Sequence, residues 1–310
     1  MRVLITCPPM LRKIDDLRHL FDQKKVDMFC PAVIQALSEE ELVRLVPQFD
    51  GWIIGDDPAT RRVFEAGKKG CLKAAVKWGV GVDNVDFTAA RDFGIPVTNT
   101  PTMFGGEVGD VAMSYITALA RETFLIDREV RAGKWPKLAG LSLTGKMLGL
   151  VGFGDIGKAT AKRALAADMR VIAYERTPRP LSDAACIEFA TWPERVEECD
   201  FLVLTCSLNE TNRHMVNGGV LAKVKKGIRM VNVARGALIS EVDLIHALED
   251  GTVHSAALDV FETEPLPMSS PLRKFERCIF GSHNGSNTAE AVARTTERAV
   301  ALLFGFLGVA

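Results

Sequence analysis

The chain has 310 residues, of which 47% are apolar and 25% charged, and its formal net charge is −1 at pH 7. This composition is typical of a soluble globular protein long enough for two domains, and it provides no electrostatic case for binding nucleic acid. The seven cysteines show neither metal-ligand spacing nor a disulfide framework, so no metal is expected. With no membrane-length apolar run and no N-terminal leader, we expect a cytoplasmic protein.

The first third of the chain alternates short apolar runs with longer amphipathic stretches. Alternation of this kind is typical of βαβ units built around a parallel sheet. Strands are predicted at residues 3–6, 52–54, 74–76 and 95–98. We therefore expect an α/β domain over residues 1–98.

A long helix is predicted over residues 108–125, and it leads into a Gly/Pro-punctuated arm that contains Trp135. A second βα series then begins. Its strands are predicted at residues 147–151, 171–174, 201–205, 230–233, 256–260 and 279–281. These strands predict a doubly wound sheet, so residues 99–288 are expected to form a Rossmann domain.

The last stretch, residues 288–307, places Ala, Val and Leu at the three- and four-residue spacings of a helix. We expect this helix to return to the first domain. The predicted fold class is therefore α/β, with two doubly wound domains of Rossmann or flavodoxin type. Residues 1–98 and 289–310 would form one discontinuous domain, with a cleft between the two domains.

The most specific local motif is a Gly-x-Gly-x-x-Gly run, in which Gly152, Gly154 and Gly157 follow an apolar strand and precede a helix-compatible stretch. In such a motif the first glycine permits a tight turn, the second lets the backbone approach a pyrophosphate, and the third lets the helix pack closely on the strand. The helix N-terminus then faces the phosphate charge. Asp155 and Ile156, inside the motif, are expected to contact the cofactor as well.

Glu175 ends the next strand, about 20 residues beyond the motif, where an acidic side chain can accept hydrogen bonds from the adenosine ribose hydroxyls. This position favours NAD. Arg176 and Arg179 follow at once, and arginines in this loop can instead bind the 2′-phosphate of NADP. NAD is therefore the predicted cofactor, and NADP stays open.

Three later segments place polar residues where strands of the second sheet are predicted to end, at residues 231–236, 258–265 and 281–284. Doubly wound sheets bind their ligands at such strand ends. Together with residues 77–86 and 94–101, these segments resemble the D-isomer-specific 2-hydroxyacid dehydrogenase family, in the same order along the chain. That family includes phosphoglycerate, glyoxylate/hydroxypyruvate and D-lactate dehydrogenases. The resemblance implies an oxidoreductase that interconverts a D-2-hydroxy acid and its 2-keto acid by hydride transfer.

The resemblance also implies the catalytic residues. Arg235 is expected to bind the carboxylate and keto oxygen of the substrate, because a guanidinium offers two parallel donors. His283 is expected to act as general acid and base, while Glu264 orients the imidazole and favours its charged form. The histidines expected to be structural or exposed are His19, His214, His246 and His254.

The resemblance implies that residues 1–98 with 289–310 form the substrate-binding domain, that residues 99–288 form the dinucleotide-binding domain, and that the active site lies in the cleft between them. It also implies further contacts for both substrate and cofactor. The loop formed by Gly79, Val80 and Gly81 would hold the substrate carboxylate through backbone N–H groups, and Asp259 would lie near the nicotinamide carboxamide. The remaining predicted cofactor contacts are Cys206, Thr211, Val233 and Gly285. The chain departs from the family pattern at Ser282, which replaces a frequent proline, and in the polar run of residues 284–287.

Two alternatives stay open. One is a non-enzymatic NAD(H)-sensing scaffold, since co-repressors of the same superfamily keep the fold, although the chain lacks the long tails expected of such a hub. The other is phosphoglycerate dehydrogenase specifically. Asp56 and Asp57 oppose that reading, because they stand where an arginine usually binds the substrate phosphate, although Arg61, Arg62 or Lys77 could compensate. A length of 310 residues also leaves no room for the regulatory domain of many such enzymes.

The expected partners are a small 2-hydroxy or 2-keto acid and a second copy of the chain, with no nucleic acid and no membrane. A twofold homodimer is the commonest soluble oligomer. The long helix at residues 108–125 and the arm bearing Trp135 are expected to clasp the second subunit.

Overall fold

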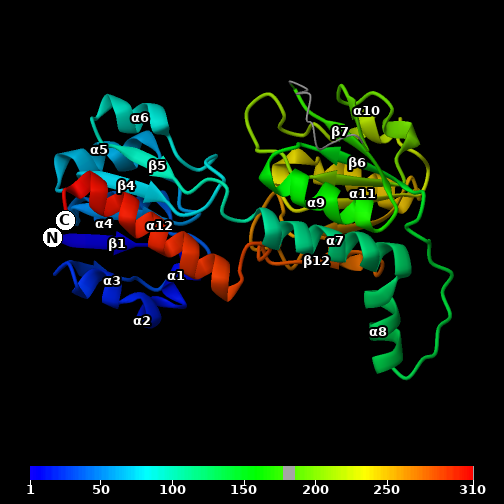
Figure 1. Cartoon of the computed structure of the whole chain (residues 1–310), viewed down its shortest axis with the longest axis horizontal. Helices are drawn as coiled ribbons and strands as arrows, with labels where there is room; N and C mark the ends of the chain where they lie inside the picture. The colour runs from blue at the N-terminus through cyan, green and yellow to red at the C-terminus, as the bar shows by residue number, and fades with distance from the viewer. Residues whose placement is uncertain (177–185, 310) are drawn as a thin grey trace. The chain divides into compact units, whose positions relative to one another are not determined.

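The computed structural model of the chain describes residues 1–176 and 186–309 (Figure 1). These residues group into two compact units, one formed by Met1–Met103 with Asn287–Ala310 and the other by Phe104–Ser286. Each unit contains one sheet flanked by helices. Within the described residues, no helix is both long enough and apolar enough to cross a membrane.

The first unit is built on a five-stranded sheet in the order β2-β1-β3-β4-β5, and every neighbouring pair is parallel. This is the flavodoxin-like order. The strands are β1 (Arg2–Ile5), β2 (Asp27–Phe29), β3 (Gly51–Ile54), β4 (Ala74–Lys77) and β5 (Val97–Asn99). The sequence does not predict β2, because this short edge strand is mostly exposed and has no apolar run.

Helices flank both faces of the first sheet. They are α1 (Pro8–Leu11), α2 (Ile14–Leu17), α3 (His19–Asp22), α4 (Glu39–Leu45), α5 (Arg61–Lys69), α6 (Phe87–Asp92) and α12 (Ala289–Leu307). One face of the sheet buries Leu4, Trp52 and Ile54 against α4 and α5. The C-terminal helix α12 packs on β3 and β4, and its Phe304 meets Phe21 edge to face with ring centroids 5.5 Å apart. The chain thus returns to the first unit after completing the second.

The second unit is built on a seven-stranded parallel sheet in the order β12-β11-β10-β9-β6-β7-β8. The order reverses between β6 and β9, which is the switch point where sheets of this kind bind ligands. The strands are β6 (Met147–Val151), β7 (Arg170–Tyr174), β8 (Ile187–Ala190), β9 (Phe201–Leu204), β10 (Ile228–Asn232), β11 (Val253–Leu258) and β12 (Ile279–Phe280). All except β8 are predicted from the sequence, with ends that differ by up to three residues.

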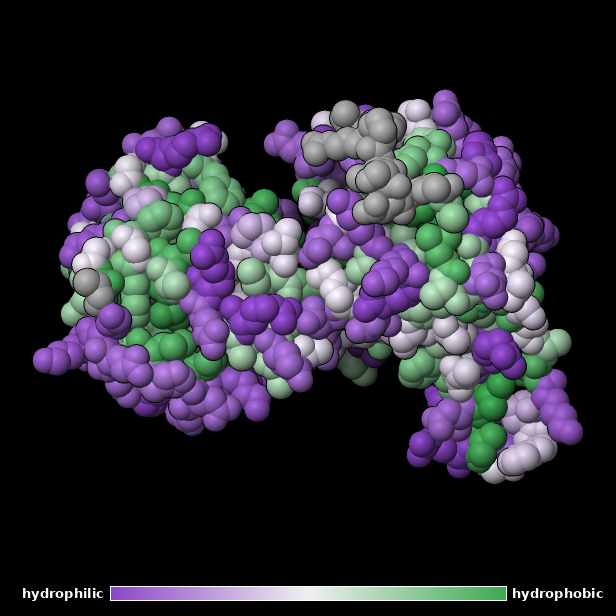
Figure 2. Space-filling view, viewed as in Figure 1, coloured by the Kyte–Doolittle hydropathy of each residue, from purple (hydrophilic) through white to green (hydrophobic). Residues whose placement is uncertain are grey.

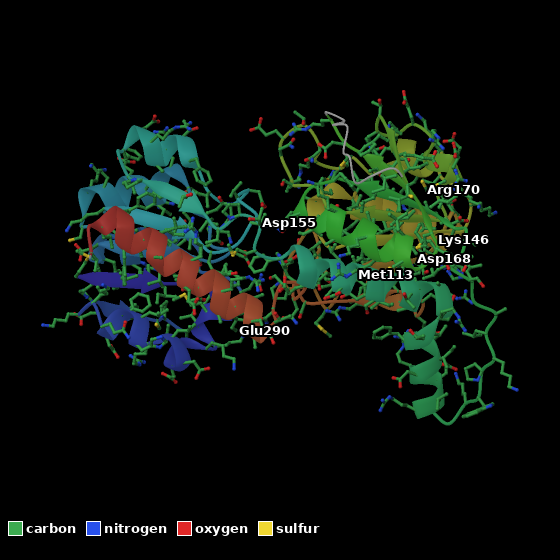
Figure 3. All side chains as sticks on the ribbon, in the orientation of Figure 1. Met113, Lys146, Asp155, Asp168, Arg170 and Glu290 are labelled. Carbon is green, nitrogen blue, oxygen red and sulfur yellow. The ribbon has the colours of Figure 1, made fainter. Side chains whose placement is uncertain are left out.

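Helices also cover the second sheet. They are α7 (Gly105–Arg121), α8 (Thr123–Arg131), α9 (Asp155–Ala166), α10 (Gly218–Leu221) and α11 (Glu241–Glu249). Helices α7 and α9 pack along one another on the sheet, and Figure 3 labels Met113 on α7 and Asp155 at the N-terminal end of α9. A further large core cluster of the unit packs α10 and α11 on the sheet through residues such as Val220 and Leu244.

The prediction of one continuous helix over residues 108–125 is wrong. The helix ends at Arg121 and a new one begins at Thr123, because Glu122 adopts a left-handed backbone conformation with φ 56°. The Glu122 carboxylate is buried and lies 3.4 Å from His254 Nε2 and 3.7 Å from Arg277 Nε. These tertiary contacts accompany a break for which the local sequence holds no glycine or proline signal.

Candidate functional site

The turn between β6 and α9 has the geometry that the glycine motif requires. Gly152 has φ 98°, and a Cβ at that position would lie 2.7 Å from the backbone nitrogen of Cys206. A Cβ on Gly157 would lie 2.2 Å from the Gly152 carbonyl oxygen, so only glycine lets α9 pack this close to the turn. Gly154, in contrast, has no neighbour within 4 Å of such a Cβ. The turn is therefore tight on its inner side and open at Gly154, at the N-terminus of α9.

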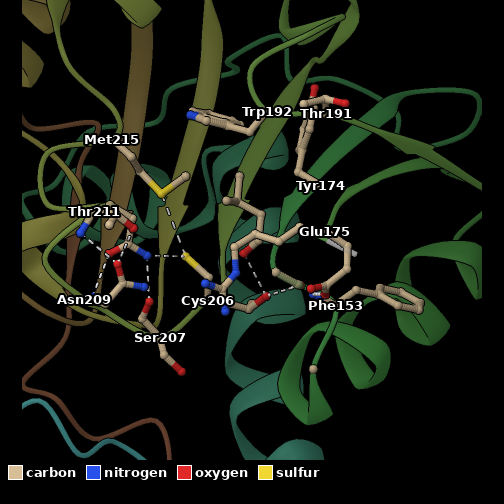
Figure 4. A pocket seen from close by; sticks show the side chains of 16 residues that line it. Phe153, Tyr174, Glu175, Thr191, Trp192, Cys206, Ser207, Asn209, Thr211 and Met215 are labelled. Carbon is tan, nitrogen blue, oxygen red and sulfur yellow. Dashed lines mark hydrogen bonds between the residues drawn. The ribbon is translucent and has the colours of Figure 1, made fainter. Parts of the chain in front are cut away.

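A cavity of about 560 Å³ opens beside this turn, at the carboxyl ends of β6, β7 and β9 (Figure 4). Of the predicted cofactor contacts, the following line it: Gly152, Gly154, Glu175, Arg176, Cys206 and Thr211. Those that do not line it are Asp155, Ile156, Gly157, Val233, Asp259 and Gly285. Its size and its place at the switch point suit a small-molecule ligand.

Glu175 lies directly after β7, and its Oε2 accepts a hydrogen bond of 3.1 Å from the backbone N–H of Phe153 in the glycine turn. The carboxylate is therefore held at the edge of the cavity beside the turn (Figure 4). Arg176 follows it and is exposed. Arg179, the other arginine considered for NADP, lies outside the described residues.

The cavity is also lined by side chains that the sequence does not single out, including Thr191, Trp192 and Met215 (Figure 4). Trp192 packs edge to face on Tyr174, with ring centroids 5.2 Å apart. Burial raises the pKa of the Cys206 thiol to about 11, so that this thiol stays protonated at neutral pH. Trp192 follows β8, a strand that the sequence does not predict, so the sequence does not place Trp192 at the end of a strand.

These features fit a dinucleotide. The open side of Gly154 and the N-terminus of α9 can receive a pyrophosphate, and the Glu175 carboxylate can accept from ribose hydroxyls. Apolar and aromatic walls can hold the adenine ring. The cavity can therefore accept the pyrophosphate and the adenosine part of NAD.

Beyond β10, the turn that carries Arg235 is shaped by Asn232. The buried Asn232 side chain accepts from the Ala234 N–H at 3.0 Å and donates to the Arg235 carbonyl at 2.8 Å. The Arg235 guanidinium donates to the Ala234 carbonyl through Nη1, also at 2.8 Å. A buried side chain amide thus fixes the backbone on both sides of the arginine.

Glu264 and His283 lie together. His283 Nδ1 is 2.8 Å from Glu264 Oε2, and Glu264 Oε1 accepts from the backbone N–H of Phe261 at 2.9 Å. The backbone of His283 has φ 55°, a left-handed conformation that is uncommon for residues other than glycine. Its backbone N–H donates to the Asp259 carbonyl at 2.7 Å. Glu264 therefore holds the His283 ring through Nδ1, while the Asp259 carbonyl holds the backbone of the same residue.

Asp259 joins the histidine loop to the arginine turn. Its backbone N–H donates to the Asn232 carbonyl at 2.9 Å, and its buried carboxylate accepts from the N–H groups of Gly285 at 2.9 Å and Asn284 at 3.3 Å. A Cβ on Gly236 would lie 1.8 Å from the Phe261 carbonyl carbon, so the arginine turn also presses directly on the glutamate loop. Arg235, Glu264 and His283 thus belong to one connected piece of the second unit.

A second group of charged side chains supports the glutamate loop. Glu262 accepts from the Glu241 backbone N–H at 2.8 Å and lies 3.1 Å from His214 Nε2, while its own backbone N–H donates to Glu241 Oε1 at 2.7 Å. Burial raises the pKa of Glu241, as do the charges of Glu262 and Glu264. His214, to which the sequence assigned no role, therefore links the loop bordering the cavity to the loop that carries Glu264.

In the first unit, the loop after β4 is held from several sides. The Gly79 N–H donates to Thr100 Oγ1 at 2.8 Å, and Asn99 Nδ2 donates to the Val80 carbonyl at 3.0 Å. Lys77, which is 3% exposed, donates from Nζ to Asp56 Oδ1 at 3.2 Å and to the Trp78 carbonyl at 3.1 Å. The loop predicted to bind the substrate carboxylate is thus rigidly supported, with a buried cation beneath it.

The two carboxylates after β3 have different surroundings. Asp57 is fully buried and accepts from Thr6 Oγ1, from the Leu37 N–H at 2.9 Å and from the Gly55 N–H at 2.9 Å. Burial raises the pKa of Asp57. The Asp56 side chain is 39% exposed beside Lys77. Asp57 therefore connects the segments that follow β1 and β3, whereas the Asp56 carboxylate is partly exposed to solvent.

A parallel sheet in the Rossmann order, with a glycine turn, an acidic strand end and a cavity between them, defines a dinucleotide-binding protein. Residues 113–285 match the family model described as D-isomer specific 2-hydroxyacid dehydrogenase, NAD binding domain. The chain belongs to the D-isomer specific 2-hydroxyacid dehydrogenase family.

The chain is 38% identical over 279 residues to the hydroxypyruvate reductase of Thermotoga maritima, and the match covers 88% of this chain and 90% of that protein. It is 37% identical over 259 residues to D-3-phosphoglycerate dehydrogenase 2, chloroplastic, of Arabidopsis thaliana, covering 82% of this chain but 41% of that protein. Among solved structures, the TT0316 protein of Thermus thermophilus superposes with a TM-score of 0.87 at 32% identity, covering 99% of this chain and 97% of that one.

These similarities confirm the sequence-based predictions of the family, of an α/β fold with two Rossmann-like units, and of NAD as cofactor. They also confirm the prediction of an NAD-dependent dehydrogenase acting on D-2-hydroxy acids.

Proposed function

We propose that the chain reduces a small, unphosphorylated 2-keto acid of the hydroxypyruvate or glyoxylate type to the D-2-hydroxy acid, with NADH. The observation that supports the chemistry best is the 2.8 Å contact between His283 Nδ1 and Glu264 Oε2, in the same unit as the Arg235 turn. A histidine with one ring nitrogen on a carboxylate can exchange a proton through the other.

In the proposed reaction Arg235 binds the substrate carboxylate and keto oxygen and polarises the carbonyl. NADH, when bound, supplies the hydride to the carbonyl carbon. His283 gives the proton from Nε2 to the carbonyl oxygen, which balances the reduction to an alcohol. Glu264 stabilises the charged imidazole before the proton leaves. Backbone N–H groups of Val80 and Gly81 are the proposed partners of the substrate carboxylate.

The charges of the first unit support an unphosphorylated substrate. Asp56 leaves a carboxylate partly exposed after β3, and the Lys77 ammonium beside it is committed to that carboxylate. Arg61 is paired with Asp92, and Arg62 with the carboxylates of Glu39 and Glu40. None of the three basic side chains considered for phosphate binding is therefore without an acidic partner.

Turnover of a panel of 2-keto acids tests the proposal. The panel contains hydroxypyruvate, glyoxylate, pyruvate and 3-phosphohydroxypyruvate, with NADH consumption as the signal and the His283→Ala variant as the background. We expect the kcat/KM of the best unphosphorylated acid to exceed that of the phosphorylated one by about tenfold or more. A preference for the phosphorylated acid would assign the chain to phosphoglycerate metabolism instead. NADH binding without turnover of any acid would indicate a sensing scaffold.

A homodimeric state and a cytoplasmic location are part of the same proposal. All seven cysteines are free thiols, which supports a reducing compartment.

A further inference from the structure

Tyr115 on α7 reaches the residue that organises the histidine loop. Its hydroxyl donates a hydrogen bond of 3.4 Å to Asp259 Oδ1. Burial, followed by the charge of Asp259, raises the pKa of Tyr115. The phenol therefore stays protonated over the whole working range of pH and is a permanent donor to the carboxylate.

The hydroxyl of Tyr115 also lies where a side chain at residue 281 would point. A Cβ on Gly281 would lie 2.1 Å from Asp259 Oδ1 and 2.6 Å from the Tyr115 hydroxyl oxygen. Gly281 directly follows β12 and comes two residues before His283. Gly281 therefore leaves free the space beside the Asp259 carboxylate that the Tyr115 hydroxyl approaches.

Three donors converge on the Asp259 carboxylate. They are the Tyr115 hydroxyl and the backbone N–H groups of Asn284 and Gly285. The Asp259 carbonyl in turn accepts the N–H of His283 at 2.7 Å. Because Oδ1 is shared between Tyr115 and Asn284, the position of the hydroxyl helps to set the rotation of the carboxylate. The same carboxylate accepts the backbone N–H groups of the two residues that directly follow the histidine.

We propose that Tyr115 is a positioning residue for His283 that acts through Asp259, and that Gly281 provides the space in which it does so. Tyr115 is not proposed to touch substrate or cofactor. This role rests on the proposed function only in naming His283 as the proton donor. The effect on the loop itself can be measured without any substrate.

The first experiment compares Tyr115→Phe with Thr117→Val, which removes a hydroxyl from an exposed position of the same helix. Amide hydrogen exchange in the protein without cofactor reports on residues 282–286. We expect faster exchange there in Tyr115→Phe and no change in Thr117→Val, because the shared acceptor loses one of its donors. Unchanged exchange in Tyr115→Phe would overturn the proposal whatever the enzyme's substrate proves to be.

Kinetics separate positioning from packing. At 3.4 Å the hydrogen bond is longer than usual, so we expect the kcat for keto-acid reduction in Tyr115→Phe to fall by about five- to tenfold. The fall in kcat should exceed any rise in the dissociation constant of NADH, followed by quenching of tryptophan fluorescence, and the thermal midpoint should stay close to that of Thr117→Val. An unchanged kcat, or a loss explained entirely by weaker NADH binding or a lower thermal midpoint, would contradict a positioning role.

A double-mutant cycle tests whether Tyr115 and Gly281 act together on the Asp259 carboxylate. Gly281→Ala alone should reduce kcat severely, since its methyl group would lie 2.1 Å from Asp259 Oδ1 and 2.6 Å from the Tyr115 hydroxyl oxygen, so that the carboxylate must move. In the Tyr115→Phe background the same substitution should cost less, because the carboxylate can turn into the space that the hydroxyl leaves. Strict additivity of the two effects would show that the residues act independently and would overturn the proposed pairing.

Discussion

His283 Nδ1 lies 2.8 Å from Glu264 Oε2, and the other oxygen of that carboxylate accepts the Phe261 backbone N–H. Both oxygens of Glu264 are therefore engaged, one in setting the loop and the other in holding the imidazole. A carboxylate at this distance favours the charged form of a histidine. Nε2 is then the ring nitrogen that points away from the glutamate and can exchange a proton with substrate.

The first prediction concerns Glu264→Gln. The glutamine keeps the shape and a hydrogen bond but removes the negative charge that favours the protonated histidine. For keto-acid reduction, which requires that form, the alkaline limb of kcat/KM should move toward lower pH by about one unit or more. His283→Ala should remove the limb together with most of the activity. An unshifted limb in Glu264→Gln would mean that Glu264 does not tune the proton donor.

The second prediction concerns cofactor choice. Glu175 is held at the cavity edge by the Phe153 N–H, where its charge should repel the 2′-phosphate of NADP and its free lone pairs should accept from a ribose hydroxyl. The wild-type kcat/KM should therefore be higher with NADH than with NADPH. Glu175→Ala should lower the ratio of kcat/KM with NADH to kcat/KM with NADPH by about tenfold. A wild-type preference for NADPH would instead give Arg176 the deciding role.

The sequence predicts most of the fold because its main signals are local. The glycine run at residues 152–157 lies between an apolar strand and a helix, and Glu175 follows at the expected distance, so this half of the site needs no tertiary information. The catalytic segments follow strands whose apolar runs are clear. Arg235, Glu264 and His283 could therefore be assigned by resemblance alone, without the tertiary contacts that connect their loops.

Other features depend on contacts between distant residues and have no local signal. The break at Glu122 accompanies side-chain contacts to His254 and Arg277. The role of Tyr115 depends on Asp259, which is far away in the chain and is brought close by the packing of α7 on β11. Likewise, His214 meets Glu262 only because two loops fold together. Periodicity can predict the elements that bear such residues but not the contacts between them.

The third prediction concerns the His214 and Glu262 contact beneath the glutamate loop. Glu262 also binds the start of α11, so it couples that helix to the loop carrying Glu264. Glu262→Gln and His214→Gln should each lower kcat by about three- to tenfold, and the double variant should lose little more than either single one. His246→Gln, an exposed change on α11, is the control. Additive losses would show that the two residues do not act as a pair.

The fourth prediction concerns self-association through α8 and the segment after it. Helix α8 has no buried residue, and Figure 2 shows apolar side chains on its surface. The exposed apolar residues of this region are Phe124, Val130, Trp135 and Leu138. Light scattering should give twice the 33.8 kDa chain mass, and Phe124→Glu with Trp135→Glu should halve it, while Ile34→Glu should not. A wild-type mass equal to one chain would contradict the prediction.

The fifth prediction concerns the dependence of stability on pH, and it comes from His254. Burial lowers the pKa of His254 to about 4 from its ordinary value of 6.5, and the nearby charges of Arg229 and Arg277 act in the same direction. Glu122 lies 3.4 Å away and opposes them, but its carboxylate is shared with Arg277. Burial and the two guanidinium groups therefore outweigh Glu122, and the pKa of His254 is lowered.

Above pH 6.5 His254 is neutral in both the folded and the unfolded chain, so it contributes no pH dependence there. As the pH falls from 6.5 to about 4, the unfolded chain takes up the proton and the folded chain does not, which lowers the free energy of unfolding. The loss should reach about 3 kcal/mol and level off below the folded-state pKa. Urea unfolding of His254→Gln at pH 7 and pH 4.5 should show a smaller acid loss than wild type, whereas the exposed control His246→Gln should keep the wild-type loss. Equal acid losses in wild type and His254→Gln would show that the histidine is protonated in the folded protein, and that Glu122 outweighs the two arginines.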